Sequence, residues 1–178
     1  MSSESCEELF TPHSPHIELS LNGVEIISNG SGSHHELRKL NVRTDLIMSA
    51  MAKSGGAYLY ANQQGCDGGR CYYDGCAMIA MNGKLLAQAS QFCVSDVEVR
   101  ARCCRVPPHR LTTDVEGRAQ VISATIDLDQ IRSVRAASSS RSIQASSVGS
   151  IPRVAVPFSL TGGTRTPQRT ESRHPWCA

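Results

Sequence analysis

The sequence has few aromatic residues, no long apolar run and no excess of either charge. Of its 178 residues, 4% are aromatic, with one Trp and three Phe, and the net charge is +2. A transmembrane helix needs about eighteen consecutive apolar residues, so we expect no membrane partner. Without a dense basic block or many aromatic side chains for base stacking, we also expect no nucleic-acid partner. The length fits one ordinary domain.

The start of the chain lacks the basic and apolar regions of a secretory signal peptide. We therefore expect a cytoplasmic protein whose eight cysteines are mostly reduced. Three of them, Cys66, Cys71 and Cys76, are separated by four residues each. Structural zinc sites use tighter pairs of the CxxC type, which the sequence lacks, and on a strand this spacing puts neighbouring cysteines on opposite faces. The sequence thus predicts no metal site.

Several segments of the first half of the chain have the patterns of regular elements. Residues 23–33 predict a buried strand followed by a loop, and residues 35–56 predict a helix that ends at two glycines. Residues 57–65 predict a second strand, with two tyrosines on one face. Residues 72–90 predict two strands joined by the turn Asn82-Gly83, because Asn-Gly between apolar residues favours a hairpin. This order indicates an α/β fold with a layered core.

The pattern changes after Gln91. Residues 100–120 contain adjacent cysteines and a Pro-Pro pair without a sustained period, which predicts an irregular surface insertion. Residues 121–138 predict a strand and a short helix, and residues 138–160 predict a polar loop followed by a strand. The last segment, 161–178, is poor in apolar residues and is expected to be a disordered tail.

Cys6 is a candidate nucleophile in the segment "CEELFTPHSPH". It precedes residues that favour a helix, but the carboxylates that follow it oppose formation of a thiolate. On these grounds alone the signal is weak, because most cysteines are small core residues.

Several ordered motifs together make the sequence resemble a known family. They are "CEELFTPHSPH", "GVEIISNGSGSHHELRK", "ANQQGCDG", "YYDGCAMIAMNG" and "IPRVAVPF". This set resembles the glutaminase domain of glutamine-dependent NAD synthetases, within the nitrilase or carbon–nitrogen hydrolase family, over residues 3–99 and 121–160. The resemblance implies a nitrilase-type four-layer α-β-β-α sandwich, incomplete at its N-terminal side. Residues 1–160 would form the C-terminal part of that domain.

The resemblance implies a role for Cys6 and for its neighbours. Cys6 would attack the side-chain amide of glutamine and form a thioester. It would lie on a strand-to-helix elbow, where backbone N–H groups favour a thiolate. Glu7 would face the ammonium group of the substrate, and Glu8 would be structural or solvent-facing.

The resemblance places further substrate contacts in the loop after the first predicted strand. Ser33 would contact the amino-acid end of glutamine, and Lys39 or Arg38 would pair with its carboxylate. A solvated helix face is the alternative for both basic residues. His34 and His35 are adjacent and point to different faces, so we expect them to shape or cap the loop and not to bind a metal together.

Other parts of the family enzyme have no match in this sequence. The resemblance implies a general-base glutamate and an oxyanion-binding lysine on segments that precede Met1. ATP with Mg and deamido-NAD would bind to a synthetase domain whose pyrophosphate loop is absent, so we expect no cofactor in this segment. The expected partners are glutamine, the synthetase domain and other copies in a homo-oligomer. A non-catalytic isoform or interaction module, or another amidase of the superfamily, remains an alternative.

Overall fold

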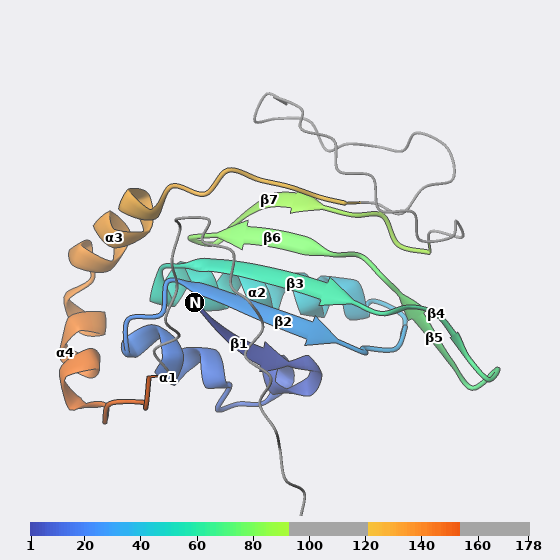
Figure 1. The fold of residues 1–178 in the computed structure, drawn as a ribbon, viewed down its shortest axis with the longest axis horizontal. Helices are drawn as coiled ribbons and strands as arrows, with labels where there is room; N and C mark the ends of the chain where they lie inside the picture. The colour runs from blue at the N-terminus through green and yellow to red at the C-terminus, as the bar shows by residue number, and fades with distance from the viewer. Residues whose placement is uncertain (93–120, 154–178) are drawn as a thin grey trace, which may run out of the picture.

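A mixed five-stranded sheet forms the centre of the protein, and the computed structural model describes residues 1–92 and 121–153 (Figure 1). The strand order is β1-β2-β3-β6-β7, with β1, β2 and β3 parallel and the last two strands antiparallel to their neighbours. The strands are β1 (Ser2–Ser5), β2 (Ile26–Ser31), β3 (Ala57–Asn62), β6 (Met78–Met81) and β7 (Lys84–Gln88). The predicted α/β class is confirmed.

The helices follow sequence signals for their ends. They are the 3₁₀ helix η1 (Cys6–Phe10), α1 (Pro15–Leu21), α2 (Lys39–Ser54), α3 (Leu128–Ala137) and α4 (Ser139–Ser147). Pro15 begins α1, as expected for the first helical position. α2 ends at Ser54 and is capped by Gly55, whose φ of 63° is tolerated best by glycine. The Asp127 side chain accepts hydrogen bonds from two backbone N–H groups at the start of α3.

The core lies between the sheet, α2 and η1. Its buried members are Leu9, Ile27, Ile47, Met51, Tyr58, Tyr60, Met78 and Ala80. Alternate residues of β3 contribute Tyr58 and Tyr60, as the period of two predicts. Burial of a large apolar side chain contributes about 1.5–3 kcal/mol, so this cluster determines which face of the sheet α2 covers.

The predicted hairpin is confirmed at the turn between β6 and β7. Asn82 and Gly83 have φ values of 50° and 80°, which the tight turn of a two-residue hairpin requires. Gly83 also lies against α2, because a Cβ atom at this position would be 2.7 Å from the Cβ atom of Ala52. The turn thus fixes the hairpin and its contact with the helix together.

The prediction of one strand before this turn is wrong. The chain bends at Gly75 and Cys76, with φ values of 69° and 64°. The residues before the bend form β5 (Cys71–Asp74), which pairs with β4 (Gln64–Asp67) in a separate antiparallel ribbon. The ribbon projects from the sheet (Figure 1). These two successive positive φ angles turn the chain out of the sheet. The alternation of apolar and polar residues in the sequence does not indicate this bend.

Two predictions in the second half are also wrong. Residues 121–127 form no strand, and the segment expected to be a polar loop forms α4. The helix is held by tertiary contacts, because the Arg141 guanidinium donates to the backbone carbonyls of Ser54 and Ser20. α4 has no buried residue, and its one large apolar side chain, Ile143, is exposed, so the sequence shows no apolar stripe that would predict this helix.

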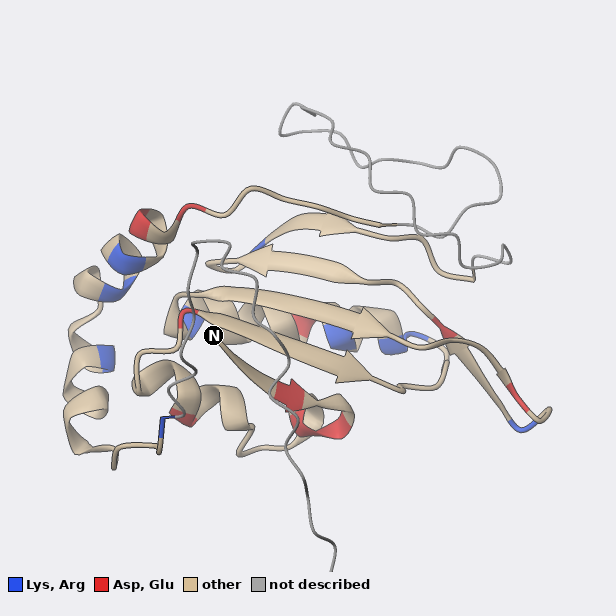
Figure 2. Ribbon diagram, in the orientation of Figure 1, with Lys and Arg blue, Asp and Glu red and all other residues tan. Residues whose placement is uncertain are grey.

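Charged residues lie mainly on the helices and on the β4–β5 ribbon, with basic and acidic residues interspersed (Figure 2). No helix in the described ranges is long and apolar enough to cross a membrane. Within the same ranges, no group of three or more His, Cys, Asp or Glu side chains is placed to hold a metal ion. The predicted insertion at 100–120 and the tail at 161–178 lie outside the described residues.

Candidate active site

Cys6 lies where β1 ends and η1 begins. Its φ of 33° is a strained value for a residue with a side chain. A sharp turn of this kind between a strand and a helix holds a nucleophile clear of the backbone. The Cys6 thiol is partly exposed and makes no hydrogen bond to the residues that the structure describes. The strand-to-helix elbow is present as predicted.

The acidic residues after Cys6 have different surroundings. The Glu8 carboxylate turns back to accept hydrogen bonds from the backbone N–H and the hydroxyl of Ser5, at 2.6 and 3.2 Å. This is a capping box, which satisfies N–H groups at the start of the helix. Glu7 is exposed and has no partner in the described ranges. Glu8 therefore stabilises the elbow, whereas Glu7 is free to meet a ligand.

A buried polar cluster anchors β1 just before Cys6. The Glu4 carboxylate accepts hydrogen bonds from the backbone N–H of His16 at 3.0 Å, from its Nδ1 at 3.1 Å and from the Tyr58 hydroxyl. Burial alone would raise the pKa of Glu4, but the bonds from His16 and Tyr58 outweigh it and hold that pKa below the ordinary value. Burial of the Tyr58 hydroxyl and its hydrogen bond to the Glu4 carboxylate raise the pKa of Tyr58 far above its ordinary range.

Ser33 lies in the loop after β2 and is almost completely buried. Asn62 binds both backbone groups of Ser33: its Oδ1 accepts from the N–H at 2.8 Å, and its Nδ2 donates to the carbonyl at 3.0 Å. The Ser33 hydroxyl accepts from Nη2 of Arg43 at 3.3 Å. The parallel strands β1, β2 and β3 end at one edge of the sheet, so this loop and the elbow share that edge.

An ion pair lies beneath this loop. Nη2 of Arg43 is 3.3 Å from the Asp74 carboxylate, and the two side chains are 0% and 1% exposed. Burial by itself would raise the pKa of Asp74, but the hydrogen bond from Gln91 and the charge of Arg43 hold it below its ordinary value. The guanidinium also lies 5.2 Å from the centre of the Tyr60 ring, and burial raises the pKa of Tyr60.

The two basic candidates at the start of α2 differ in position. Arg38 is exposed and adopts a left-handed conformation with φ of 65°. Lys39 is partly buried, with Nζ 5.9 Å from the centre of the Phe10 ring in η1 and 3.7 Å from Glu36. Lys39 therefore lies toward η1, the helix that begins at Cys6, whereas Arg38 is exposed to solvent.

The adjacent histidines have separate contacts. Nε2 of His34 lies 2.8 Å from the Glu36 carboxylate at the surface. The half-buried His35 ring packs edge-on against Phe92 at 4.7 Å, and its backbone N–H donates to the carbonyl of Tyr72. The bond from His35 to Tyr72 connects the loop to β5, as expected for a residue that shapes the loop.

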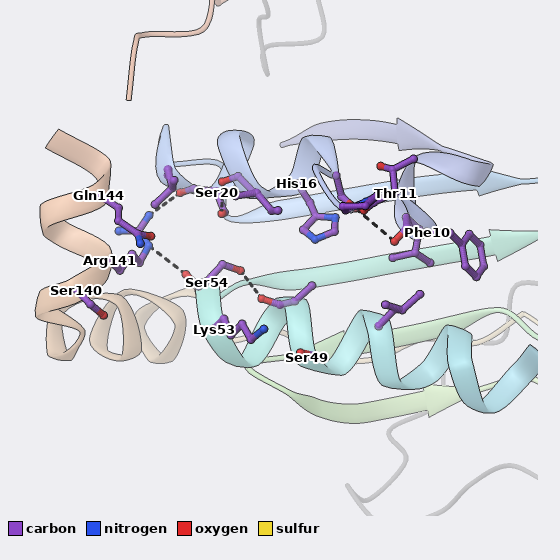
Figure 3. A pocket seen from close by; sticks show the side chains of 17 residues that line it. Phe10, Thr11, His16, Ser20, Ser49, Lys53, Ser54, Ser140, Arg141 and Gln144 are labelled. Atoms are coloured by element: carbon purple, nitrogen blue, oxygen red, sulfur yellow. Dashed lines mark hydrogen bonds between the residues drawn. The ribbon is translucent and has the colours of Figure 1, made fainter. Parts of the chain in front are cut away.

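A cavity of about 590 Å³ lies between η1, α1, α2 and α4 (Figure 3). Leu9 and Ile17 contribute to its apolar lining, and His16, Lys53 and Arg141 bring polar groups to it. The lining residues do not include Cys6 or the predicted substrate contacts. The cavity is thus separate from the amide chemistry expected at the elbow.

Sequence reasoning missed the buried polar residues that support the site. Arg43 could have been found, because it shares a spacing of four with the buried residues Ile47 and Met51 on one face of α2. A charged residue on an apolar face needs a buried partner. No comparable signal identifies Asp74, whose partners come from other elements.

Comparison with known proteins is consistent with this geometry. The sequence profile of the family described as carbon-nitrogen hydrolase matches residues 1–107. Over 159 residues the chain is 54% identical to a glutamine-dependent NAD(+) synthetase of Macaca fascicularis, covering 89% of this chain and 19% of the relative. It is 57% identical over 143 residues to the enzyme of that name from Saccharomyces cerevisiae, covering 80% of this chain and 17% of the relative.

A solved structure supports the fold. A carbon-nitrogen hydrolase from Helicobacter pylori matches with a TM-score of 0.53 at 17% identity, over 75% of this chain and 42% of that one. The chain spans about a fifth of the length of the two synthetases. The resemblance seen in the motifs is confirmed, and the chain belongs to the carbon-nitrogen hydrolase family.

Proposed function

We propose that this chain forms the nucleophile-bearing part of a glutaminase domain in an enzyme of the glutamine-dependent NAD(+) synthetase type. The main support is the position of Cys6, on a strained elbow at the sheet edge that also carries the Ser33 loop. Residues 1–160 would contribute the C-terminal part of that domain. The high identity to synthetases over most of the chain favours this substrate over other amides.

In the proposed reaction, the Cys6 thiolate attacks the side-chain carbonyl carbon of glutamine and gives a tetrahedral oxyanion. The C–N bond breaks, ammonia leaves with an added proton, and a thioester remains. Water then attacks the thioester, releasing glutamate and the thiol. Glu7 would meet the substrate's ammonium group, Ser33 its amino-acid end and Lys39 its carboxylate.

Ammonia from this step would serve the amidation of deamido-NAD in an ATP- and Mg-dependent synthetase domain. That domain would be the main partner of this segment, together with further copies in a homo-oligomer. We assign no cofactor to the segment itself.

A non-catalytic role is the second candidate, and the surroundings of the thiol favour it for the isolated chain. No carboxylate or amine of the described residues binds the Cys6 thiol. General acid–base help is worth about a hundred- to ten-thousand-fold in rate. We therefore expect the chain alone to release little glutamate from glutamine, even where it recognises the substrate.

Recognition can be tested without turnover. The chloromethyl ketone analogue of glutamine, in its L and D forms, alkylates a thiolate by displacing chloride. We expect Cys6 to react about tenfold faster with the L form, a difference that corresponds to ~1.4 kcal/mol of chiral contact. The exposed Cys66 is an internal reference that should show no preference. Peptide mass spectrometry measures both rates.

Variants of the expected contacts complete the test. Glu7→Gln and Lys39→Met should each reduce the ratio of L to D rates at Cys6 without changing its rate with chloroacetone, which has no amino-acid end. Equal rates for the two enantiomers at Cys6 of the unmodified chain would contradict the proposed function.

A further inference from the structure

The Ser33 loop is held by side chains from two other elements, β3 and α2. Asn62, at the end of β3, binds both the N–H and the carbonyl of Ser33. Arg43, on α2, donates to its hydroxyl. All three polar groups of Ser33 are therefore bound, and the loop has little freedom to change its path.

Asp74 connects the two residues that hold Ser33. Its Oδ1 accepts from Nη2 of Arg43 at 3.3 Å and from Nδ2 of Asn62 at 3.1 Å. Its Oδ2 accepts from Nε2 of Gln91 at 2.6 Å. Asp74 is the last residue of β5, so it also ties the base of the ribbon to this loop.

The charge of Arg43 makes this arrangement depend on Asp74. The guanidinium is wholly buried, and its Nε and Nη1 atoms have no hydrogen-bond partner in the described part of the chain. Asp74 is the carboxylate within ion-pair distance of it in that part of the chain. A buried charge that loses its partner must move toward water or rearrange its surroundings. Either movement would release the Ser33 hydroxyl.

We infer that Asp74 is a positioning residue, which acts through Arg43 and Asn62 to fix the Ser33 loop for the amino-acid end of the substrate. This inference rests on the proposed function. Asp74 itself is 1% exposed and does not need to touch the substrate. Its effect should therefore appear in discrimination between substrates and not in the intrinsic reactivity of the thiol.

The test uses the full chain and the reagents described above. We expect Asp74→Asn to reduce the L-to-D rate ratio at Cys6 about tenfold, to near unity, because Arg43 and Asn62 no longer share a charged acceptor. The rate with chloroacetone should stay unchanged. Asp67→Asn is a matched control, since Asp67 lies on the same ribbon, exposed and paired with Arg70, and it should keep the full ratio.

A second variant covers the case in which Asp74→Asn does not fold. Asn62→Ala removes both hydrogen bonds to the Ser33 backbone and leaves the buried ion pair in place, and it should also lower the ratio. An unchanged ratio in a folded Asn62→Ala or Asp74→Asn chain would overturn the inference while the proposed function stands. An equal fall in the chloroacetone rate would also overturn it, because that pattern indicates general disruption of the elbow. Loss of enantiomer preference in the unmodified chain would instead remove the proposed function.

Discussion

Replacement of Glu4 tests how β1, the strand that directly precedes Cys6, is held in place. The Glu4 side chain is fully buried and accepts hydrogen bonds from the backbone and imidazole of His16 and from the Tyr58 hydroxyl. Among the described strands β1 pairs with β2 alone, and the Glu4 bonds connect it further to α1 through His16 and to β3 through Tyr58. We therefore expect a large effect from Glu4→Ala.

The structure sets the size of that effect. Each buried polar group left without a partner costs about 1–3 kcal/mol. Glu4→Ala removes the acceptor of three donors, the His16 N–H, the His16 ring and the Tyr58 O–H, although the Tyr58 oxygen still accepts from Asn29. These losses are coupled and do not add, so we expect a fall of about 3–5 kcal/mol in the free energy of unfolding, as for other broken buried pairs. Glu4→Gln keeps the shape and one acceptor, and it should cost less than half of this.

The pH dependence provides an independent check. The folded-state pKa of Glu4 lies below its ordinary value of 4.5, so the carboxylate's contribution is complete above that pH and is lost as the pH falls through the lowered pKa. Urea unfolding followed by circular dichroism at pH 7 and below pH 4.5 measures both effects. The Glu4→Gln chain should lose less stability on acidification than the unmodified chain. A cost below about 1 kcal/mol for Glu4→Ala at neutral pH would refute the reasoning.

Two further predictions concern the hairpin and the thiols. Gly83→Ala should lower the free energy of unfolding by about 1–3 kcal/mol, because φ of Gly83 is 80° and the new Cβ atom would lie 2.7 Å from that of Ala52. Thermal unfolding measures this loss, and Gly149→Ala is the control, because open space surrounds Gly149. Iodoacetamide should modify Cys76 much more slowly than Cys66, because Cys76 is buried, which also raises the pKa of its thiol, while Cys66 is exposed. Comparable rates in native protein would show that the bend between β5 and β6 opens readily.

Local sequence signals were enough for most of the sheet and for α2. The apolar segment of β2, the alternation in β3 and the Asn82-Gly83 turn each depend on residues close together in the chain. The ribbon and α4 could not be predicted in this way. The ribbon depends on two positive φ angles at Gly75 and Cys76, and α4 depends on contacts of Arg141 with carbonyls more than eighty residues away in the chain. The period of apolar residues in the sequence indicates neither the ribbon nor α4.

The residues of the candidate site also divide into those that local sequence reveals and those that depend on tertiary contacts. Cys6 and Ser33 lie in motifs that a short window of sequence reveals, and the strained elbow and the loop after β2 are formed locally. The residues that support them are not local: Glu4 meets Tyr58 from another strand, and Asp74 meets Arg43 from a helix. Each is a buried carboxylate whose partner could be named only once the strands were in register. Sequence reasoning therefore finds the residues that would contact the substrate more readily than those that hold them, because the second group is defined by tertiary pairing.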